Sequence, residues 1–240
     1  MRSEWWTYRL SDFLMFSART WQRLFELYNA EVWPMHVVTL SLGAAMGMLA
    51  LRALARPWAA AAVFGVLALA WGWVGWAFHW QRYATINWAA VWFGVAFAVQ
   101  GLLLIGAAWR AGGRVATGWG RAGALGRGGA RGTVGAGLAL LLFALLVQPL
   151  IGVALGRPWR QAEVFGIAPD PTVAATLGVL LALRPVQCVR AWSLWIVPLL
   201  WCAVSGATAW ALQAADAWLM PLAGVLAVGA AWRTGATGSR

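Results

Sequence analysis

The chain has 240 residues, of which 62% are hydrophobic and 10% charged, and its mean hydropathy is +0.70. Charged residues make up about a quarter of a typical soluble domain, so this composition excludes a soluble globular protein and predicts a membrane protein. The net charge of +11 arises from arginines that lie between apolar stretches, where they indicate membrane orientation and contact with lipid headgroups. Membrane lipid is therefore an expected partner and nucleic acid is not.

The first 32 residues form an amphipathic segment ahead of the first long apolar stretch. Its apolar positions, at helical spacing, are Leu14, Ala18, Trp21, Phe25 and Tyr28, and its charged positions are Asp12, Arg19, Arg23 and Glu26. We expect residues 1–32 to form an interfacial helix that lies flat on the membrane, either as an anchor or as a docking helix for another protein. No cleavable signal peptide is predicted, so the mature chain is expected to begin near Met1.

Residues 33–240 are predicted to form a single transmembrane domain, an all-α bundle of about seven spans. A helix needs about 20 apolar residues to cross the hydrocarbon core of a bilayer, which is about 30 Å thick. Seven windows approach that length: 33–51, 57–79, 86–109, 134–155, 171–186, 191–212 and 218–232.

The fifth window is the weakest of these. It offers only "PTVAATLGVLLAL" before Arg184 and Pro185, so it crosses the membrane only if Arg184 extends toward the headgroups. Its start is better marked, because Asp170 can cap a helix whose first position is Pro171. Six helices and a re-entrant segment are the alternative.

The distribution of arginines gives the expected orientation, because connections between seven spans alternate between two faces. One face receives Arg52, Arg56, Arg110, Arg114, Arg121, Arg127, Arg131, Arg184, Arg190, Arg233 and Arg240. All acidic residues, including Glu163, Asp170 and Asp216, fall on the other face. The arginine-rich face should be cytoplasmic, which places the N-terminus outside and the C-terminus inside a bacterial inner membrane.

The connection at residues 110–133 is rich in glycine and arginine, and we expect a flexible cytoplasmic loop. Its glycine spacings superficially match phosphate-binding loops. The preceding strand and the lysine that reaches a phosphate are both missing, so nucleotide binding is not predicted.

The two histidines, His36 and His79, fall near the outer ends of the first and second windows. Histidine is a common ligand of haem and metals, so a pair at one membrane depth is a weak candidate for binding haem or copper. No CxxCH motif, carboxylate–histidine pattern or methionine ladder accompanies the pair. The favoured interpretation has both side chains hydrogen-bonded to backbone or water at the interface, and no cofactor is identified.

Candidate ligand-binding residues gather around the turn "FHWQRYATINW", residues 78–88, which joins the second and third windows on the expected outer face. Indole rings can hold a flat apolar ligand or a cation against their faces. The predicted site has walls formed by Trp73, Trp76, Trp80, Trp88 and Trp92, and a polar rim formed by His79, Arg82, Tyr83 and Asn87. The alternative assigns the tryptophans to helix packing and interfacial anchoring, and the polar residues to helix capping.

Chemistry inside the membrane is not indicated. Apart from the histidines near the outer interface and Arg184 near the inner one, no ionisable residue falls inside a predicted span, which disfavours a proton pathway. Interior polar residues such as Gln148 and Ser205 are expected to bond between helices. No nucleophile, general base and orienting group occur at a suitable spacing, so the chain is predicted not to be an enzyme.

The stretches "EWWTYRLSDFLMFS", "LFELYNAEVWP" and "FHWQRYATINWAA" resemble recurring blocks of a family of small, tryptophan-rich bacterial inner-membrane proteins of unknown function, some of which are labelled permeases. The resemblance covers the first hundred or so residues best. It implies a polytopic bacterial inner-membrane protein, but no activity, cofactor or residue role. A major-facilitator transporter is a poor match, because the chain has about half the helices that two six-helix halves require.

Three hypotheses follow. In the favoured one, a non-catalytic membrane protein binds or passes a small hydrophobic or aromatic-compatible solute through the outer aromatic cluster. In the second, the chain is an accessory or scaffold subunit of an inner-membrane complex, with another membrane protein as its partner. In the third, His36 and His79 bind haem or copper. The substrate itself is not identified.

Overall fold

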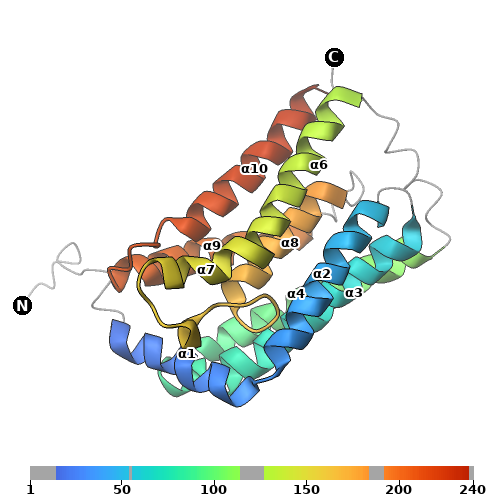
Figure 1. Ribbon diagram of the computed structural model, residues 1–240. Coiled ribbons are helices and arrows are strands. Elements are labelled where there is room, and N and C mark those ends of the chain that lie inside the picture. Colours follow the sequence, from blue (N-terminus) through green and yellow to red (C-terminus); the bar gives the residue numbers. More distant parts are fainter. Residues whose placement is uncertain (1–14, 54–55, 114–126, 184–191, 238–240) are drawn as a thin grey trace, which may run out of the picture.

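The computed structural model describes residues 15–53, 56–113, 127–183 and 192–237, and over these ranges the fold is entirely helical. Figure 1 shows long helices forming a bundle, with the first helix, α1 (Ala18–Val32), across one end. The C-terminal half of the last helix lies at the opposite end, near the C-terminus (Figure 1). The predicted all-α bundle is therefore confirmed.

The helix α1 begins at a capped residue and presents one apolar face to the bundle. The Ser17 hydroxyl accepts a hydrogen bond of 3.2 Å from the backbone nitrogen of Thr20, which satisfies one of the free N–H groups in the first turn. Leu24, Phe25 and Tyr28 are buried. The apolar face of this amphipathic segment thus packs against the chain itself, and the residues before 15 lie outside the described ranges.

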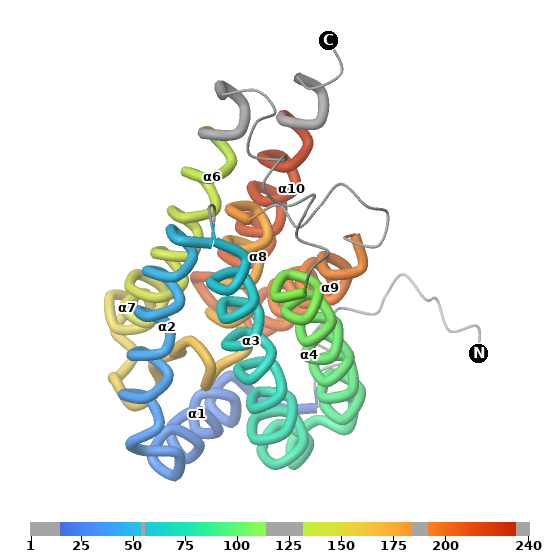
Figure 2. The backbone as a smooth tube through the Cα atoms, turned by 90° about the vertical axis from the view of Figure 1, so that its right-hand side faces the viewer, coloured from blue at the N-terminus to red at the C-terminus, as the bar shows by residue number. Residues whose placement is uncertain are grey.

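Three long helices follow α1 and form the first half of the bundle. They are α2 (Met35–Ala53), α3 (Pro57–Trp73) and α4 (Ala90–Gly112). The chain between α3 and α4 forms a π-helical continuation of α3, η3 (Val74–Trp80), and a short 3₁₀ turn, η4 (Tyr83–Thr85). The turn at residues 78–88 therefore joins the second and third predicted windows, as expected. Figure 2 shows α3 and α4 side by side, and α2 packs on α3.

The second half of the bundle is built around α8. Its elements are α6 (Arg127–Leu142), the π-helical η6 (Phe143–Val147), α7 (Gln148–Ala154), α8 (Pro169–Leu183), α9 (Ser193–Ala211) and α10 (Leu219–Thr237). The helices α6, η6 and α7 follow one another without a break. α6, α9 and α10 cover three sides of α8, and α2 and α3 contact it from the first half.

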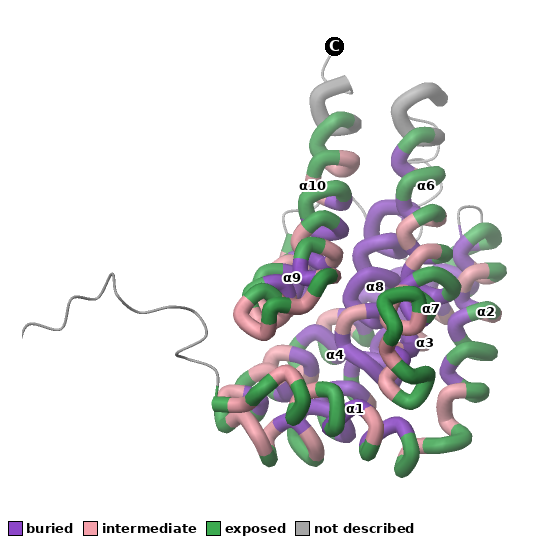
Figure 3. The backbone as a smooth tube through the Cα atoms, turned by 60° about the vertical axis from the view of Figure 1, so that its left-hand side comes forward, coloured by how far each residue is buried: buried purple, intermediate pink, exposed green. Residues whose placement is uncertain are grey.

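The helix α8 is enclosed by protein along its whole length. Every residue from Pro169 to Leu183 except Asp170 is buried, and Figure 3 shows α8 as a buried element at the centre of the bundle. A hydrogen bond of 2.8 Å from Trp71 Nε1 on α3 to Thr176 Oγ1 fixes α8 against the first half. Buried polar groups of such a helix must find their partners within the protein.

The described residues support the seven predicted membrane spans only in part. Five helices are long and apolar enough to cross a membrane: Met35–Ala53, Pro57–Thr85, Ala90–Gly112, Gly132–Ala154 and Ser193–Ala211. The fifth and seventh windows correspond to shorter apolar helices, Pro169–Leu183 and Leu219–Arg233. With 15 residues, α8 is about 22 Å long, less than the thickness of the hydrocarbon core. Hydropathy alone does not reveal that α8 is short and enclosed by protein, because burial in protein and burial in lipid both select apolar side chains.

The glycine- and arginine-rich loop predicted at residues 110–133 is shorter at both ends in the structure. α4 extends to Gly112, and α6 begins at Arg127. Small residues on α6 permit close packing against its neighbours, which offsets their low helix propensity. Residues 114–126 lie outside the described ranges, so the flexibility expected there stays a prediction.

α6 and α8 approach each other most closely at a pair of glycines. A Cβ atom on Gly137 would lie 2.5 Å from the Gly178 carbonyl oxygen and 2.5 Å from the Ala182 nitrogen. A Cβ atom on Gly178 would in turn lie 2.7 Å from the Gly137 oxygen. Since these obstructing atoms are backbone, no side-chain rotation relieves the overlap. The two glycines therefore set the distance at which α6 covers α8.

Replacing Gly137 with alanine is expected to force α6 away from α8 and to lower the free energy of unfolding by about 1–3 kcal/mol, the usual cost of overpacking. The melting temperature of the purified protein in mild detergent measures this loss. Gly135 is the matched control on the same helix, because a Cβ atom there meets nothing within 4 Å. Equal melting temperatures for Gly137→Ala and Gly135→Ala would contradict the close approach.

Candidate functional site

The chain between α7 and α8, residues 155–168, folds into the molecule, and we call it the inner segment. It contains one 3₁₀ turn, η7 (Trp159–Gln161), and is otherwise irregular. Phe165 and Ile167 are almost completely buried. An irregular backbone has no helix or sheet to satisfy its N–H and C=O groups, so side chains must do so.

The helix α1 supplies several of these partners. Asn29 Nδ2 donates to the carbonyl oxygens of Arg160 at 2.9 Å and Ala162 at 3.0 Å. The Tyr28 hydroxyl donates to the carbonyl oxygen of Ile167 at 3.2 Å. α1 therefore holds the inner segment inside the bundle, a role that its amphipathic pattern did not reveal.

The inner segment leads into α8 through a glycine and a threonine. Gly166 has a φ of +73°, a conformation that favours glycine. Its backbone nitrogen donates to Thr172 Oγ1 at 2.9 Å, and the Thr172 hydroxyl donates to the carbonyl oxygen of Ala168 at 2.8 Å. These bonds fix the first turn of α8, and with it Asp170, inside the protein.

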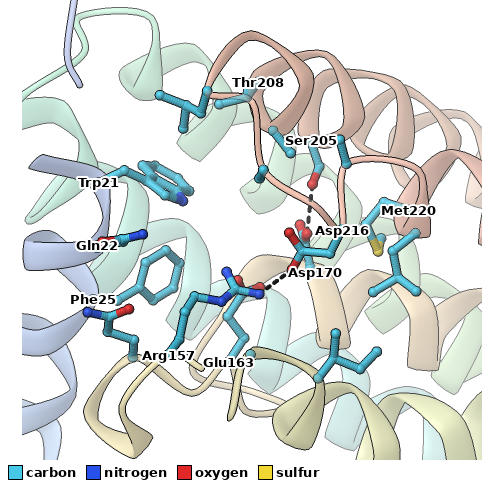
Figure 4. A pocket seen from close by; sticks show the side chains of 18 of the residues that line it. Trp21, Gln22, Phe25, Arg157, Glu163, Asp170, Ser205, Thr208, Asp216 and Met220 are labelled. Carbon is cyan, nitrogen blue, oxygen red and sulfur yellow. Dashed lines mark hydrogen bonds and ion pairs between the residues drawn. The ribbon is translucent and has the colours of Figure 1, made fainter. Parts of the chain in front are cut away.

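A cavity of about 370 Å³ lies between α1, the inner segment, α9 and the start of α10. Figure 4 shows the side chains of Arg157, Glu163, Asp170 and Asp216 pointing toward one another in this space, with Trp21 of α1 at one side. The wall therefore carries three carboxyl groups and one guanidinium group.

Asp170 is held by two donors from α9. The indole nitrogen of Trp201 donates to Oδ1 at 2.7 Å, and the Ser205 hydroxyl donates to Oδ2 at 2.6 Å. Trp201 and Ser205 are one helical turn apart, so they reach the same carboxyl group from one face of α9. The two bonds fix the carboxyl plane and leave further acceptor sites on each oxygen.

Arg157 and Asp216 form an ion pair across the cavity. Arg157 belongs to the inner segment and Asp216 to the connection before α10, so the pair joins two parts of the chain distant in sequence. The two side chains are 26% and 18% exposed. At this burial each charge depends strongly on the other, because water screens them only in part.

Glu163 has no such partner. Within the part of the chain that the structure describes, its carboxyl group makes no hydrogen bond or ion pair, although Asp170, Arg157 and Asp216 are near. Burial raises the pKa of Glu163 from the ordinary 4.5 to about 8; the Asp170 carboxylate adds to the increase and Arg157 opposes it. The group therefore keeps its proton at neutral pH when the cavity holds no cation.

A neutral amide adds another free acceptor to the wall. Gln148, the first residue of α7, is only 6% exposed and lines the cavity. Its Nε2 contacts Met220 Sδ at 3.7 Å, but its Oε1 accepts no hydrogen bond from any described residue. Gln161 Oε1 also lines the cavity without a partner among those residues. A buried acceptor without a donor is costly, so these oxygens indicate a ligand that carries donors.

The arrangement does not resemble a metal centre. Among the described residues, no group of three histidine, cysteine, aspartate or glutamate side chains is placed to hold a metal ion. His36 shares a hydrogen bond of 3.2 Å with Asn29, whereas His79 lies among aromatic rings. The two histidines occupy different surroundings, so the geometry gives no support to the haem or copper hypothesis.

The predicted tryptophan walls lie away from this cavity. Trp76, Trp80, Trp88 and Trp92 are exposed on the surface of the bundle, and Trp73 packs edge to face with Trp76 at a ring separation of 5.6 Å. None of the five lines the cavity. Their exposure fits lipid contact and interfacial anchoring, the alternative interpretation of the sequence.

His79 is not at a polar rim, as predicted, but completely buried. Its ring centroid lies 4.5 Å from that of Phe97 and 5.0 Å from that of Trp201, and neither ring nitrogen has a partner among the described residues. The reason is the π-helical η3, whose wider turns shift side-chain directions away from those of an α-helix with 3.6 residues per turn.

The other predicted rim residues hold the turn at residues 78–88 together. Arg82 forms an ion pair with Glu31 of α1, and Asn87 Nδ2 donates to the Tyr83 hydroxyl at 2.9 Å. Arg82 lines a second hollow of about 790 Å³ beside α1. Of the nine predicted residues, only Tyr83 lines the carboxyl cavity.

Arg157, Glu163, Asp170 and Asp216 were not predicted as site residues. The acids were expected to share one face of the membrane, with no role in ligand binding. One signal was available: the chain has only seven acidic residues, and two of them, Glu163 and Asp170, lie just before the weakest predicted span.

The ion pair across the cavity should show energetic coupling. In a double-mutant cycle of Arg157→Gln and Asp216→Asn, we expect a coupling free energy of about 1 kcal/mol or more, because either charge alone is left partly buried. SDS-induced unfolding of the protein in mixed micelles measures it. The control pair Arg23–Glu26, with exposures of 64% and 23%, should couple by less than about 0.5 kcal/mol. Equal coupling in the two pairs would show that the Arg157–Asp216 pair is effectively solvated.

Glu163 should make stability depend on pH. The folded carboxyl keeps its proton up to about pH 8, whereas the unfolded one loses it near 4.5, so its stabilising contribution is full below pH 4.5 and is lost as the pH approaches 8. Between pH 5 and 8, the melting temperature of the wild type should therefore fall relative to that of Glu163→Gln. Glu31→Gln, which changes an acid outside the cavity, should follow the wild type. Parallel curves for the wild type and Glu163→Gln would refute the raised pKa.

Comparison with known proteins gives a family and no activity. No curated protein and no solved structure matches the chain. The sequence model of a family of unknown function, DUF6064, matches residues 18–238, a range that includes every described helix and all residues of the cavity wall. The bacterial origin and the permease label implied by the sequence resemblance stay predictions. The chain therefore belongs to the DUF6064 family of proteins of unknown function.

Proposed function

We propose that this protein is a non-catalytic, membrane-embedded binding protein, permease-like in its action, whose ligand is a small organic cation held in the carboxyl cavity. The composition of the cavity wall is the observation that carries this proposal: Glu163, Asp170 and Asp216 face a single arginine. If all four groups are ionised, the wall has a net charge of −2 (three negative groups and one positive). An enclosed excess of negative charge is complemented by a cation.

The free acceptors favour a cation that donates hydrogen bonds. Gln148 Oε1 is buried without a donor, and the Glu163 carboxyl group has no partner among the described residues. A primary ammonium group supplies three N–H donors together with its positive charge. Such a group carries the donors that the amide oxygen and the carboxyl group both lack, whereas a quaternary ammonium group carries none.

The apolar part of the wall indicates what the rest of the ligand is like. Trp21 and Phe25 of α1, Tyr83 of η4 and Trp201 of α9 line the same cavity. Aromatic faces bind apolar groups and attract cations. A volume of about 370 Å³ is at the small end for ligand pockets, which suits a compact solute with an apolar body. We thus keep the aromatic-compatible solute expected from the sequence and move its site from the tryptophan surface to the carboxyl cavity.

We place the cavity near the outer face of a bacterial inner membrane, with the N-terminus outside and the C-terminus inside. The distribution of charge supports this orientation, because Arg52 and Arg110 lie in the last turns of α2 and α4, away from α1 and the acids. We further propose that the shorter apolar helices α8 and α10 also cross the bilayer, so that the chain makes seven crossings.

The accessory-subunit hypothesis has less support than it had from the sequence. It rested on the amphipathic N-terminal segment, whose apolar face packs on the chain's own core through Leu24, Phe25 and Tyr28. The exposed tryptophans suit lipid as well as a protein partner. Cation binding is favoured because it accounts for the inward-facing acids, which a scaffold does not need.

Calorimetric titration of the purified protein in mild detergent at pH 8 tests the proposal. We expect saturable binding of benzylammonium, and at least about tenfold weaker binding of benzyl alcohol, which has the same shape without the charge. Benzyltrimethylammonium, which lacks N–H donors, should also bind more weakly than benzylammonium. Uptake of labelled benzylammonium into proteoliposomes then distinguishes a permease from a binding protein.

Asp170→Asn should weaken benzylammonium binding by about tenfold or more, because it removes one of the three carboxyl groups of the wall with little change of shape. Glu31→Gln is the matched control: it removes the same charge from a residue that pairs with Arg82 and does not line the cavity. Equal affinities of wild type and Asp170→Asn, or equal affinities for the ammonium and the alcohol, would contradict the proposal.

A further inference from the structure

We propose that Glu163 exchanges a proton for the bound cation, so that each cation that enters the cavity displaces one proton from this carboxyl group. The inference rests on the proposed function and adds to it a coupling between the solute and the proton. It follows from the difference between Glu163 and the other two acids of the same wall.

The other two acids of the cavity wall, Asp170 and Asp216, already have partners. Asp216 is paired with Arg157, and Asp170 accepts hydrogen bonds from Trp201 and Ser205 on its two oxygens. Hydrogen-bond donors and a nearby positive charge favour the ionised form of a carboxyl group. Glu163 lacks either kind of support among the described residues.

The titratable and charged groups around Glu163 come from several of the elements that line the cavity. The inner segment contributes Arg157, α8 contributes Asp170, and the connection before α10 contributes Asp216. η4 adds the Tyr83 hydroxyl, and Cys202 of α9 lies close enough to Asp170 to sense its charge. The lining residues of α1 carry no titratable group: Ala18, Trp21, Gln22 and Phe25. Because the Arg157 guanidinium group is paired with Asp216, the surroundings of Glu163 carry an excess of carboxyl groups.

A second observation shows that the same space is built for a ligand. The buried Gln148 Oε1 lines the cavity with no donor from the described residues. An ammonium group that reaches this oxygen lies in the cavity that Glu163 also lines. Such a group brings both a positive charge and N–H donors to Glu163, and these are the two things that the carboxyl group lacks.

The exchange balances in atoms and charge. The neutral carboxylic acid of Glu163 and the entering ammonium ion give a carboxylate–ammonium pair and one proton, which passes to water. The O–H bond breaks with its electron pair left on the carboxylate oxygen, and nothing is oxidised or reduced. When the cation leaves, the carboxylate takes up a proton again. The charge of the occupied and empty cavity is therefore the same, which suits a site enclosed by apolar helices.

Titration calorimetry of benzylammonium in two buffers with different heats of ionisation measures the protons released. At pH 6 to 7 we expect about one proton per bound cation, because burial holds the pKa of Glu163 at about 8 in the empty protein. Glu163→Gln should bind benzylammonium without proton release. Glu31→Gln, the control outside the cavity, should release as many protons as the wild type.

The pH dependence of affinity tests the exchange without any variant. Release of one proton requires the affinity of the wild type for benzylammonium to rise by about tenfold for each pH unit below about pH 8, and to level off above it. A cation that binds with no proton release and constant affinity would overturn the exchange and leave the proposed function standing. Equal release by Glu163→Gln and the wild type would overturn it as well. Absence of benzylammonium binding at every pH would overturn both.

Discussion

The enclosure of α8 is the constraint on which the rest of the structure depends. Protein covers this helix of 15 residues along its length, and the chain before it enters the bundle with Phe165 and Ile167 buried. The backbone carbonyl groups of this inner segment need hydrogen-bond donors, and Tyr28 and Asn29 of α1 supply them. On α6, Gly137 packs closely against Gly178 of α8 and so covers another side of that helix. Each of these features has a single consequence: the first turn of α8, with Asp170, lies inside the protein.

The carboxyl cavity follows from that placement. Asp170 enters with α8, Glu163 enters with the inner segment, and Asp216 stands where α9 turns toward α10. Only one arginine accompanies them, and it is held by Asp216. In an apolar bundle, the excess of negative charge from these carboxyl groups can be neutralised by a proton or by a bound cation. The same imbalance therefore explains both the raised pKa of Glu163 and the kind of ligand that we propose.

Much of the helical framework could be predicted from the sequence, because apolar windows and arginine-rich connections are local properties. The windows at 57–79 and 191–212 closely match α3 with η3, and α9. The site could not be predicted in the same way. A hydropathy window cannot distinguish a helix buried in protein from one facing lipid, so the enclosure of α8 could not be predicted. His79 was placed at the rim because it lies at the outer end of a window, and that position does not tell whether its side chain points to the surface or into the bundle. Asp170 and Asp216 meet only through the packing of α8, α9 and α10, which no local pattern encodes.

The most direct test of this account is the infrared difference spectrum of the protein in lipid nanodiscs, recorded with and without benzylammonium at neutral pH. The account predicts a C=O stretching band of a protonated carboxylic acid in the empty protein that is absent from Glu163→Gln. Addition of benzylammonium should remove this band and increase the carboxylate bands. A wild-type spectrum with no protonated carboxyl band, or with one that benzylammonium leaves unchanged, would contradict it.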